Sequence, residues 1–487
     1  MLFNSLEFLF LYLPLVFVFF VLLGRVHRAL AGAWLVAASI YFHGYFLPQY
    51  TYLLIFSILV NYGIGLAIGR FPRGARVMLT AGIVLNLSLL GYYKYGRFFV
   101  ENANALAGTH VLLPKIALPL AISFYTFTQI AYLVDTYQGK VREQNLLHYA
   151  LFVTYFPHLI AGPILHHKEM MPQFKDKETY RLHLDRIAAG TAIFVIGLAK
   201  KVLFADEMKQ YVVPAFEAAR MGTHLAFVPS WAAALAYTLQ LYFDFSGYSD
   251  MAIGVSLLFN IHLPVNFNSP YKARNLADFW QRWHMTLSRF LRDYVYIPLG
   301  GNRKGPAKRY VNLMVTMFLG GLWHGAAWTF VVWGCLHGAG LAVSHAWTAF
   351  RARGTGAAGR PAGLLLPSRA LTFVFVVFGW VLFRSDSIAS ASVLYGGMLG
   401  RYGFGVPVWE PAVAREAFVI AGLLAIAWFA PNTLEIVRGV PADTSKRRLW
   451  QWRPTPAWGV AMSILFFALA LTVALAEKRS DFIYFNF

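Results

Sequence analysis

A histidine inside a long apolar stretch is the first candidate for chemistry in this chain. Residues 320–338, "GGLWHGAAWTFVVWGCLHG", contain His324 and His337, and residues 310–350 include no Lys, Arg, Asp or Glu. Burial disfavours the charged imidazolium, so the ring stays neutral and keeps a basic lone pair. Such a ring can take a proton from a hydroxyl and pass it to a leaving group. We predict that His324 is a general base; the alternative is a core histidine bonded to a carbonyl oxygen.

His337 has a weaker claim to a direct role. It follows His324 by 13 residues, and on one continuous helix the two rings would be about 220° apart. Either a direct role or a role in helix packing is therefore open for His337. Trp323, the neighbour of His324, is a further candidate supporting residue.

A second candidate region, residues 269–303, mixes aromatic and cationic side chains. Its sequence is "SPYKARNLADFWQRWHMTLSRFLRDYVYIPLGGNR", and Phe279, Trp283 and Phe290 recur at helical spacing. This pattern predicts an amphipathic helix at the cytoplasmic face. Its cations are candidates for binding the phosphates of a nucleotide-bearing donor, with anionic membrane lipid as the alternative ligand: Lys272, Arg274, Arg282, Arg289 and Arg292. His284, in the same region, is the second candidate catalytic residue.

Two carboxylates lie in "YFDFSGYSDMAIG", residues 242–254. Asp244 and Asp250 are at a predicted membrane boundary and need partners, for which Arg or His would serve. Their default role is structural pairing, and a supporting role in the site is the functional alternative. We expect no metal site, because the chain has a single cysteine and no HxxxH, HxxE or Cys–His spacing joins these groups.

The composition is that of a membrane protein. Of 487 residues, 58% are hydrophobic and only 13% are charged, with mean hydropathy +0.53; a soluble domain has about 25% charged residues. The net charge of +20 fits basic cytoplasmic loops, so nucleic acid is not an expected partner. We predict an all-α polytopic protein with one membrane domain over residues 1–487.

Ten segments are long and apolar enough to be predicted as full spans: 5–24, 29–47, 51–69, 77–96, 116–134, 187–204, 226–244, 370–385, 416–431 and 458–476. Several basic loops are predicted to be cytoplasmic: 70–76, 138–143, 351–360 and 445–453. Because "RVHR" directly follows the first span, we expect both termini to be periplasmic.

Three further apolar stretches do not fit as full spans. Residues 146–164 and 311–347 each lie between basic regions and must enter and leave on the cytoplasmic side, and 250–263 is too short to cross. We predict that 311–347 is a hairpin of short or tilted helices whose bend lies near "LWHGAAW". The cytoplasmic re-entrant or amphipathic regions then cover about 140–186 and 264–350.

Several motifs, in order along nearly the whole chain, resemble the membrane-bound O-acyltransferase family. They include "LFNSLEFLFLYLPLV", "ISFYTFTQIAYLVDTY", "FPHLIAGPI", "YFDFSGYSDMAIG", "FNSPYKARNLADFWQRWH", "GGLWHGAAWTFVVWGCLHG" and "FIYFNF". The likeness is to the bacterial branch that acetylates alginate and other exopolysaccharides. It implies a ring of spans around a thin waist, with a central tunnel, and the matching roles of essential catalytic histidine for His324 and second polar site residue for His284.

The resemblance also implies the reaction. It implies no cofactor, and transfer of acetyl from a cytoplasmic thioester, acetyl-CoA, across the inner membrane towards a polysaccharide such as alginate. A periplasmic SGNH-type acetyltransferase is the implied partner. Cellulose, peptidoglycan and D-alanylation of teichoic acid are the alternative substrates. A transporter or flippase, or a scaffold of the acetylation machinery without chemistry, are the alternatives from other classes.

Overall fold

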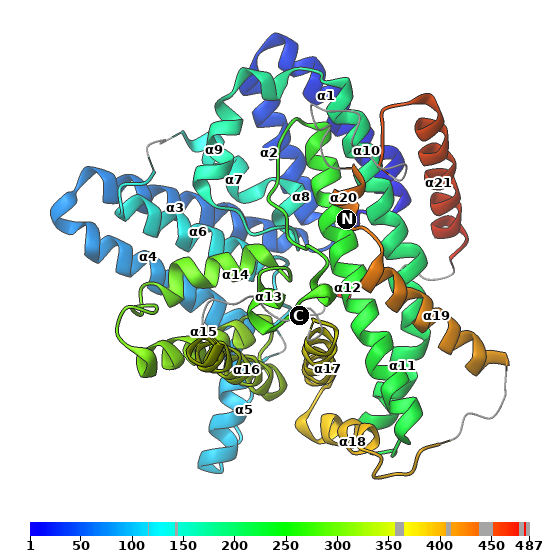
Figure 1. Ribbon diagram of the computed structural model, residues 1–487. Coiled ribbons are helices and arrows are strands. Elements are labelled where there is room, and N and C mark those ends of the chain that lie inside the picture. The colour runs from blue at the N-terminus through cyan, green and yellow to red at the C-terminus, as the bar shows by residue number, and fades with distance from the viewer. Residues whose placement is uncertain are drawn as a thin grey trace. The chain divides into compact units, whose positions relative to one another are not determined.

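The computed structural model describes residues 1–114, 116–141, 145–355, 365–405, 411–437, 451–476 and 482–483. Every regular element among them is a helix, as predicted, and they contain no strand. The predicted loops 138–143, 351–360 and 445–453 and the terminal motif at 482–487 lie partly outside the described residues. The chain divides into two compact units, whose helices are labelled in Figure 1. The prediction of one domain over 1–487 stays a prediction.

The first unit comprises Met1–Leu198, Tyr248–Pro264 and Val437–Asn486. Its main helices are α1 (Leu13–Val26), α2 (Arg28–Gly44), α3 (Thr51–Arg70), α4 (Ala75–Leu90), α5 (Gly96–Ala107), α6 (Ile122–Tyr137), α7 (Leu146–Thr154), α8 (Phe156–Leu159), α9 (His167–Lys175), α10 (Leu184–Ala199) and α21 (Pro456–Leu475).

The second unit comprises Ala199–Gly247 and Val265–Ile436, with Phe487. Its helices are α11 (Asp206–Arg220), the first part of α12 (Phe227–Leu258), α13 (Leu276–Trp280), α14 (Met285–Leu291), α15 (Pro306–His324), α16 (Trp328–Thr355), α17 (Leu365–Arg384), α18 (Ile388–Met398), α19 (Pro411–Phe429) and α20 (Thr433–Val437).

Six helical stretches among the described residues are long and apolar enough to cross a membrane. They are Phe8–Val26, Pro48–Arg70, Pro72–Ala107, Leu184–Arg220, Leu365–Arg384 and Pro456–Leu475. The other four predicted spans also coincide with helices: α2, α6, α12 and α19. The predicted bounds of two apolar segments were wrong. The segment 116–134 becomes helical only at Ile122, and 250–263 is no separate short segment, because α12 continues unbroken to Leu258.

The predicted re-entrant segment at 146–164 is a broken helix within the first unit. Asn145 caps the start of α7 through its side chain, and the helix ends at Thr154, before Tyr155, whose φ and ψ are −48° and 109°. The backbone N–H of Phe156, freed by the break, donates to the Ser39 hydroxyl at 3.0 Å. This hydrogen bond gives the N–H an acceptor, which the lipid tails of a membrane do not provide.

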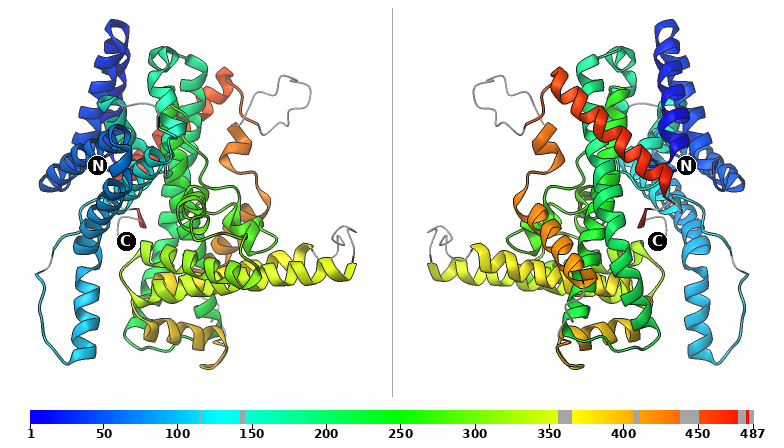
Figure 2. Two further views of the ribbon diagram at one scale, coloured as in Figure 1. Left: turned by 90° about the vertical axis from the view of Figure 1, so that its left-hand side faces the viewer. Right: turned by 90° about the vertical axis from the view of Figure 1, so that its right-hand side faces the viewer.

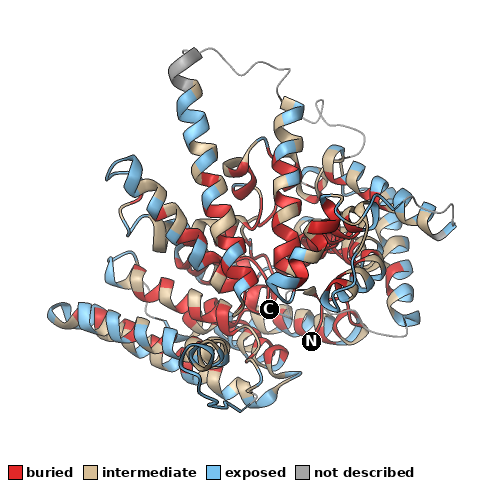
Figure 3. Ribbon diagram, turned by 90° about the horizontal axis from the view of Figure 1, so that it is seen from below, coloured by how far each residue is buried: buried red, intermediate tan, exposed pale blue. Residues whose placement is uncertain are grey.

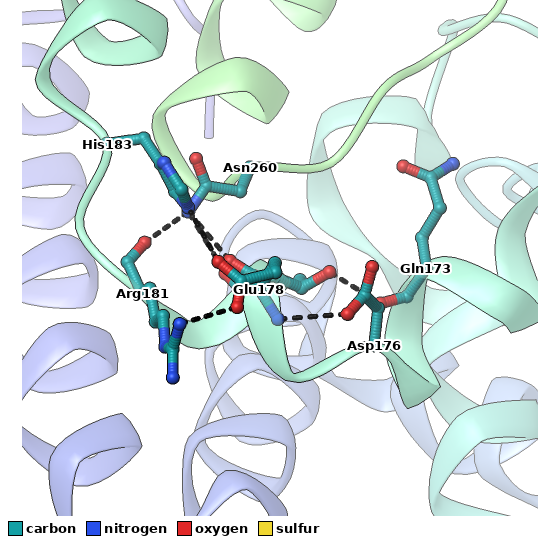
Figure 4. A network of polar contacts seen from close by, with 7 residues as sticks. Gln173, Asp176, Glu178, Arg181, His183 and Asn260 are labelled. Atoms are coloured by element: carbon teal, nitrogen blue, oxygen red, sulfur yellow. Dashed lines mark hydrogen bonds and ion pairs between the residues drawn. The ribbon is translucent and has the colours of Figure 1, made fainter.

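A cluster of polar contacts joins residues 173–181, at the end of α9 and just after it, to the turn after α12 (Figure 4). The Asn260 amide donates to the carbonyl oxygens of Glu178, Thr179 and Arg181. The Gln173 side chain pairs with the backbone of His262 in both directions, at 2.7 and 3.1 Å. Two side-chain amides therefore fix this irregular segment through backbone groups.

The α15–α16 hairpin confirms the predicted bend within 311–347. α15 ends at His324, Gly325 is extended, and α16 begins at Trp328. The hairpin is longer than predicted, because both helices run beyond 311–347. In Figure 2 it lies across α11 and the first part of α12, and neither α15 nor α16 is among the six candidate spans. In Figure 3 the turns of α16 near the bend are largely buried and its far turns exposed.

Glycines let the two hairpin helices pack backbone to backbone. A Cβ on Gly334 would overlap the Met317 carbonyl oxygen and come within 3.2 Å of the Gly321 Cα. A Cβ on Gly422, in α19, would meet nothing within 4 Å. The approach at Gly334 is therefore one that no other residue type allows without a shift of the backbone.

Gly334→Ala should lower the thermal midpoint of the detergent-purified protein. Overpacking of this kind costs about 1–3 kcal/mol, whereas Gly422→Ala should be neutral or stabilising by up to about 1 kcal/mol through helix propensity. Differential scanning fluorimetry of both variants compares the two sites. Equal midpoints for both variants would contradict the close packing.

Candidate active site

His324 lies at the bend of the hairpin, at the C-terminal end of α15. Its side chain is buried, with 3% exposure. Three aromatic rings enclose it, with centroids 4.9 Å away for Trp323, 5.2 Å for Trp333 and 5.0 Å for Phe383. These rings shield the His324 side chain from solvent.

His284 lies within ring contact of His324. The two centroids are 6.5 Å apart, and the Trp323 ring contacts both histidines. Their helices gather in one part of the second unit, where α15 packs on α16 and α13 packs on α16 (Figure 1). The structure thus brings together the two histidines that are 40 residues apart in sequence.

Asn266 holds the turn that presents His284. Its side-chain oxygen accepts from His284 Nδ1 at 3.1 Å, from Thr286 N at 3.3 Å and from Thr286 Oγ1 at 2.9 Å. Its backbone carbonyl accepts from Met285 N at 2.9 Å. One asparagine therefore bonds to three consecutive residues of the turn.

The turn at His284 is strained. Its φ of 42° lies in the left-handed region, which costs of order 1–3 kcal/mol for a residue with a side chain. This turn also corrects a prediction. The single amphipathic helix expected over 269–303 is divided into α13 and α14, because Asn266 stabilises a break between them.

The Asn266 contacts determine the tautomer of His284. The Thr286 backbone N–H can only donate, so the amide atom facing it is the oxygen, which can only accept. Nδ1 of His284 must then carry the proton, and Nε2 carries the lone pair. Burial lowers the pKa of His284 to about 3, so the ring is neutral at physiological pH.

His337 and His324 lie on different helices. The separation of about 220° expected from the sequence assumed one continuous helix, but the chain bends at Gly325, so this separation does not apply. The Trp333 ring contacts both, at 5.2 Å from His324 and 4.7 Å from His337. His337 is fully buried.

The two aspartates have separate surroundings. Asp244 is buried and its carboxylate accepts from Lys201 Nζ at 2.7 Å, and Lys201 also pairs with Asp206 at 2.9 Å. A partner of Asp244 is therefore a lysine, a cation that the sequence analysis did not name. Asp250 belongs to the first unit.

Several of the predicted donor-binding cations bond to groups within the chain. Arg282 pairs with Asp278 at 2.7 Å, Arg292 pairs with Asp293 at 2.7 Å, and Lys272 donates to the Ala430 carbonyl at 2.6 Å. Arg274 is exposed, and Arg289 is half-buried on α14. No group of three or more His, Cys, Asp or Glu that could hold a metal occurs in the described part of the chain.

Sequence reasoning missed Asn266, Trp333 and Phe383 as parts of the site. Asn266 is 18 residues before His284, and its neighbours carry no catalytic pattern. Trp333 and Phe383 read as ordinary apolar residues of membrane helices. Only their contacts with the histidine rings distinguish them.

Comparison with known proteins assigns the family. The model of the membrane-bound O-acyltransferase family matches residues 141–360. A "Peptidoglycan O-acetyltransferase" of Helicobacter pylori is 45% identical over 83% of this chain and 80% of its own length. The chain belongs to the membrane-bound O-acyltransferase family.

Other relatives in the family extend the match to the whole chain. A "Probable alginate O-acetylase AlgI" of Pseudomonas putida is 37% identical over the full length of both chains. A "Teichoic acid D-alanyltransferase" of Streptococcus thermophilus is 29% identical over 47% of this chain and 57% of its own length. The protein is thus a multi-pass membrane acyltransferase, which decides against the transporter and scaffold alternatives.

Replacing Asn266 should impair catalysis by disordering His284. Asn266→Leu removes the acceptor of His284 Nδ1–H and frees the strained turn, so we expect kcat to fall at least about tenfold, the cost of a displaced catalytic group. Acyl transfer by the purified variant measures the effect, and Asn102→Leu, outside these contacts, is the matched control. Unchanged kcat in Asn266→Leu would contradict the positioning role.

His284 should not titrate in the working pH range. Because burial lowers its pKa to about 3, the ring takes up a proton only below that pH, and it stays neutral between about pH 5 and about pH 8. Any acidic limb of the kcat profile in this range should therefore persist in His284→Asn. Loss of that limb in the variant would show that His284 is the titrating group.

Proposed function

We propose that this membrane O-acyltransferase takes an acetyl group from a cytoplasmic thioester, acetyl-CoA, and passes it across the inner membrane for O-acetylation of an exported polysaccharide. His324 is the catalytic base and His284 its partner. The observation that carries the proposal is the pair of buried histidines with centroids 6.5 Å apart at the hairpin bend. The relatives named for O-acetylation of alginate and peptidoglycan support the acetyl group and the polysaccharide.

The proposed chemistry is acyl transfer to a hydroxyl. His324 takes the proton of the acceptor hydroxyl as its oxygen attacks the thioester carbonyl carbon. A C–O bond forms, the C–S bond breaks, and the proton returns to the leaving thiolate. General base catalysis supplies about 10²–10⁴-fold, and the remaining acceleration comes from fixing the two reactants beside the base.

His284 is proposed to act on the same reacting groups as His324, because its ring lies 6.5 Å from that of His324 and both contact Trp323. The neutral ring with its proton on Nδ1 presents Nε2 as an acceptor. It is suited to orient His324 or the incoming hydroxyl. The hydrogen bonds of Asn266 fix the ring before substrate binds, so little orientational entropy is lost in the reaction.

The donor is proposed to bind from the cytoplasmic face through the segment before and after His284. Its phosphates need cations. Arg274 is the favoured candidate, because its side chain is exposed, whereas Lys272, Arg282 and Arg292 already bond to groups of the chain. The reaction needs no cofactor beyond the donor itself.

The acceptor side is proposed to lie in the periplasm, with both termini there. A periplasmic SGNH-type acetyltransferase would receive the acetyl group and esterify the sugar. The direct acceptor is then a hydroxyl of that partner or of the polysaccharide. Deleting each gene in turn and measuring ester-bound acetate on the exported polymer tests the order of the two proteins.

Peptidoglycan is a second candidate substrate, because the relative named for it has the higher identity, 45% against 37% for the alginate relative. Ester-bound acetate on purified peptidoglycan and on exported polysaccharide, compared between a deletion strain and its complemented parent, separates the two. Acetate lost from neither polymer would contradict both substrates.

His324→Ala should abolish acetyl transfer. Loss of the base lowers kcat by about 10²–10⁴-fold, and His110→Ala, at an exposed histidine, is the matched control. Transfer of radiolabelled acetyl from acetyl-CoA by protein in nanodiscs measures the rate, with thermal midpoints to verify folding. Wild-type transfer by a folded His324→Ala variant would overturn the assignment.

A further inference from the structure

A buried ion pair in the second unit lies one residue away from a ring that packs on His284. The Lys201 ammonium donates to the Asp244 carboxylate at 2.7 Å, and their side chains are only 1% and 2% exposed. Taking two ions out of water is costly, so such a pair is rarely explained by stability. Its best-established role in proteins is to fix the register of packed helices.

A π-helical turn gives Lys201 a second carboxylate. The chain between α10 and α11 forms the π-helix η6 (Lys200–Ala205), and the Asp206 N–H donates to the Lys201 carbonyl, five residues before it. In an α-helix two such residues would lie about 140° apart around the axis. The π turn places them on one face, and the Lys201 ammonium lies 2.9 Å from the Asp206 carboxylate.

Phe245 follows Asp244 on α12 and contacts the second histidine. The Phe245 side chain is buried, and its ring centroid lies 4.8 Å from that of His284, with the two ring planes at 87°. The same ring lies 4.9 Å from Phe267, the neighbour of Asn266, whose oxygen accepts from His284 Nδ1. Phe245 therefore packs against both the His284 ring and the segment that holds it.

The ion pair determines where Phe245 can be. Apolar contacts between two helices change gradually when one helix slides or rotates, whereas a hydrogen-bonded ion pair does not survive such a shift. Sliding by one turn would move Asp244 about 5.4 Å along the axis and separate two buried charges. Because Phe245 directly follows Asp244, α12 cannot shift against η6 at this level without moving the ring that contacts His284.

We propose that Lys201 and Asp244 are positioning residues for His284 and act through Phe245. The ion pair sets the register of α12 against η6, and Phe245 transmits that register to the imidazole. This role rests on the proposed function, in which His284 acts together with His324. The pair is expected to affect kcat, because a displaced catalytic group raises the barrier of the reaction.

The first test separates stability from catalysis. Lys201→Met/Asp244→Leu removes both charges and keeps side-chain volume, a replacement that is often neutral or stabilising. Asp206 is partly exposed and can be hydrated in this variant, so the thermal midpoint should match or exceed that of the unaltered protein. For acetyl transfer, kcat should fall about tenfold or more and the KM for acetyl-CoA should change less than about twofold.

The second test removes the transmitting ring. Phe245→Leu keeps the ion pair and should lower kcat by a similar factor. The triple variant with Lys201→Met and Asp244→Leu should be no slower than the more impaired of its two parents, because both changes act on one ring. Losses of kcat that add up in the triple variant would contradict transmission through Phe245.

Two controls match these changes. Phe243→Leu alters the other neighbour of Asp244 on α12, whose ring packs on Phe204 of η6 at 5.1 Å. It should lower the thermal midpoint through the cavity it leaves, with kcat unchanged. Arg415→Gln/Glu207→Gln removes an exposed ion pair of the same unit, and neither the midpoint nor kcat should change.

A third measurement needs no donor. The imidazole nitrogen chemical shifts of His284, assigned with the His284→Asn variant, report which nitrogen carries the proton. The unaltered protein should show the Nδ1–H tautomer alone. Phe245→Leu and Lys201→Met/Asp244→Leu should each show a mixture of tautomers, because the ring is no longer held against Asn266.

Each outcome decides the proposal. A normal midpoint with unchanged kcat and unchanged His284 shifts in Lys201→Met/Asp244→Leu would show that the ion pair is structural only, and would overturn the positioning role. If that variant does not fold, unchanged kcat and shifts in Phe245→Leu overturn it instead. If the unaltered protein transfers no acetyl from acetyl-CoA, the proposed donor fails, and the His284 shifts of the donor-free protein still decide the positioning role.

Discussion

The hydrogen bonds of Asn266 to residues 284, 285 and 286 are the interaction on which the arrangement of the site depends. They stabilise a left-handed residue that would otherwise relax into a continuous helix. They also assign the proton to Nδ1 of His284. A single buried amide thus determines where the second histidine is, how its ring is oriented and which nitrogen can accept.

The bend at Gly325 makes the complementary contribution. It ends α15 at His324 and turns the chain back along itself, and the glycines of the hairpin allow the two helices to pack at backbone distance. The aromatic rings around His324 then close the site. Electrostatic interactions in such a shielded site are stronger than in water.

Two contacts show how buried polar groups find partners within the chain, as a membrane protein requires. The buried Lys201 is paired with Asp244 and Asp206. The break after α7 frees the backbone N–H of Phe156, which donates to the Ser39 hydroxyl. In both places a group that lipid could not satisfy is paired with another part of the same unit.

The sequence by itself determined the all-α membrane class, most of the spans, the hairpin bend and the two histidines, because apolar length, loop charge and an isolated histidine are local signals. It started the span of α6 at residue 116, whereas the helix begins at Ile122. It also predicted two segments where α12 is one helix, and one helix where the structure has α13 and α14. It also offered Arg or His where Lys201 pairs with Asp244. Only the tertiary structure decided these points, and only it revealed Asn266, Trp333 and Phe383 as parts of the site, because their roles arise from contacts between side chains rather than from a sequence pattern.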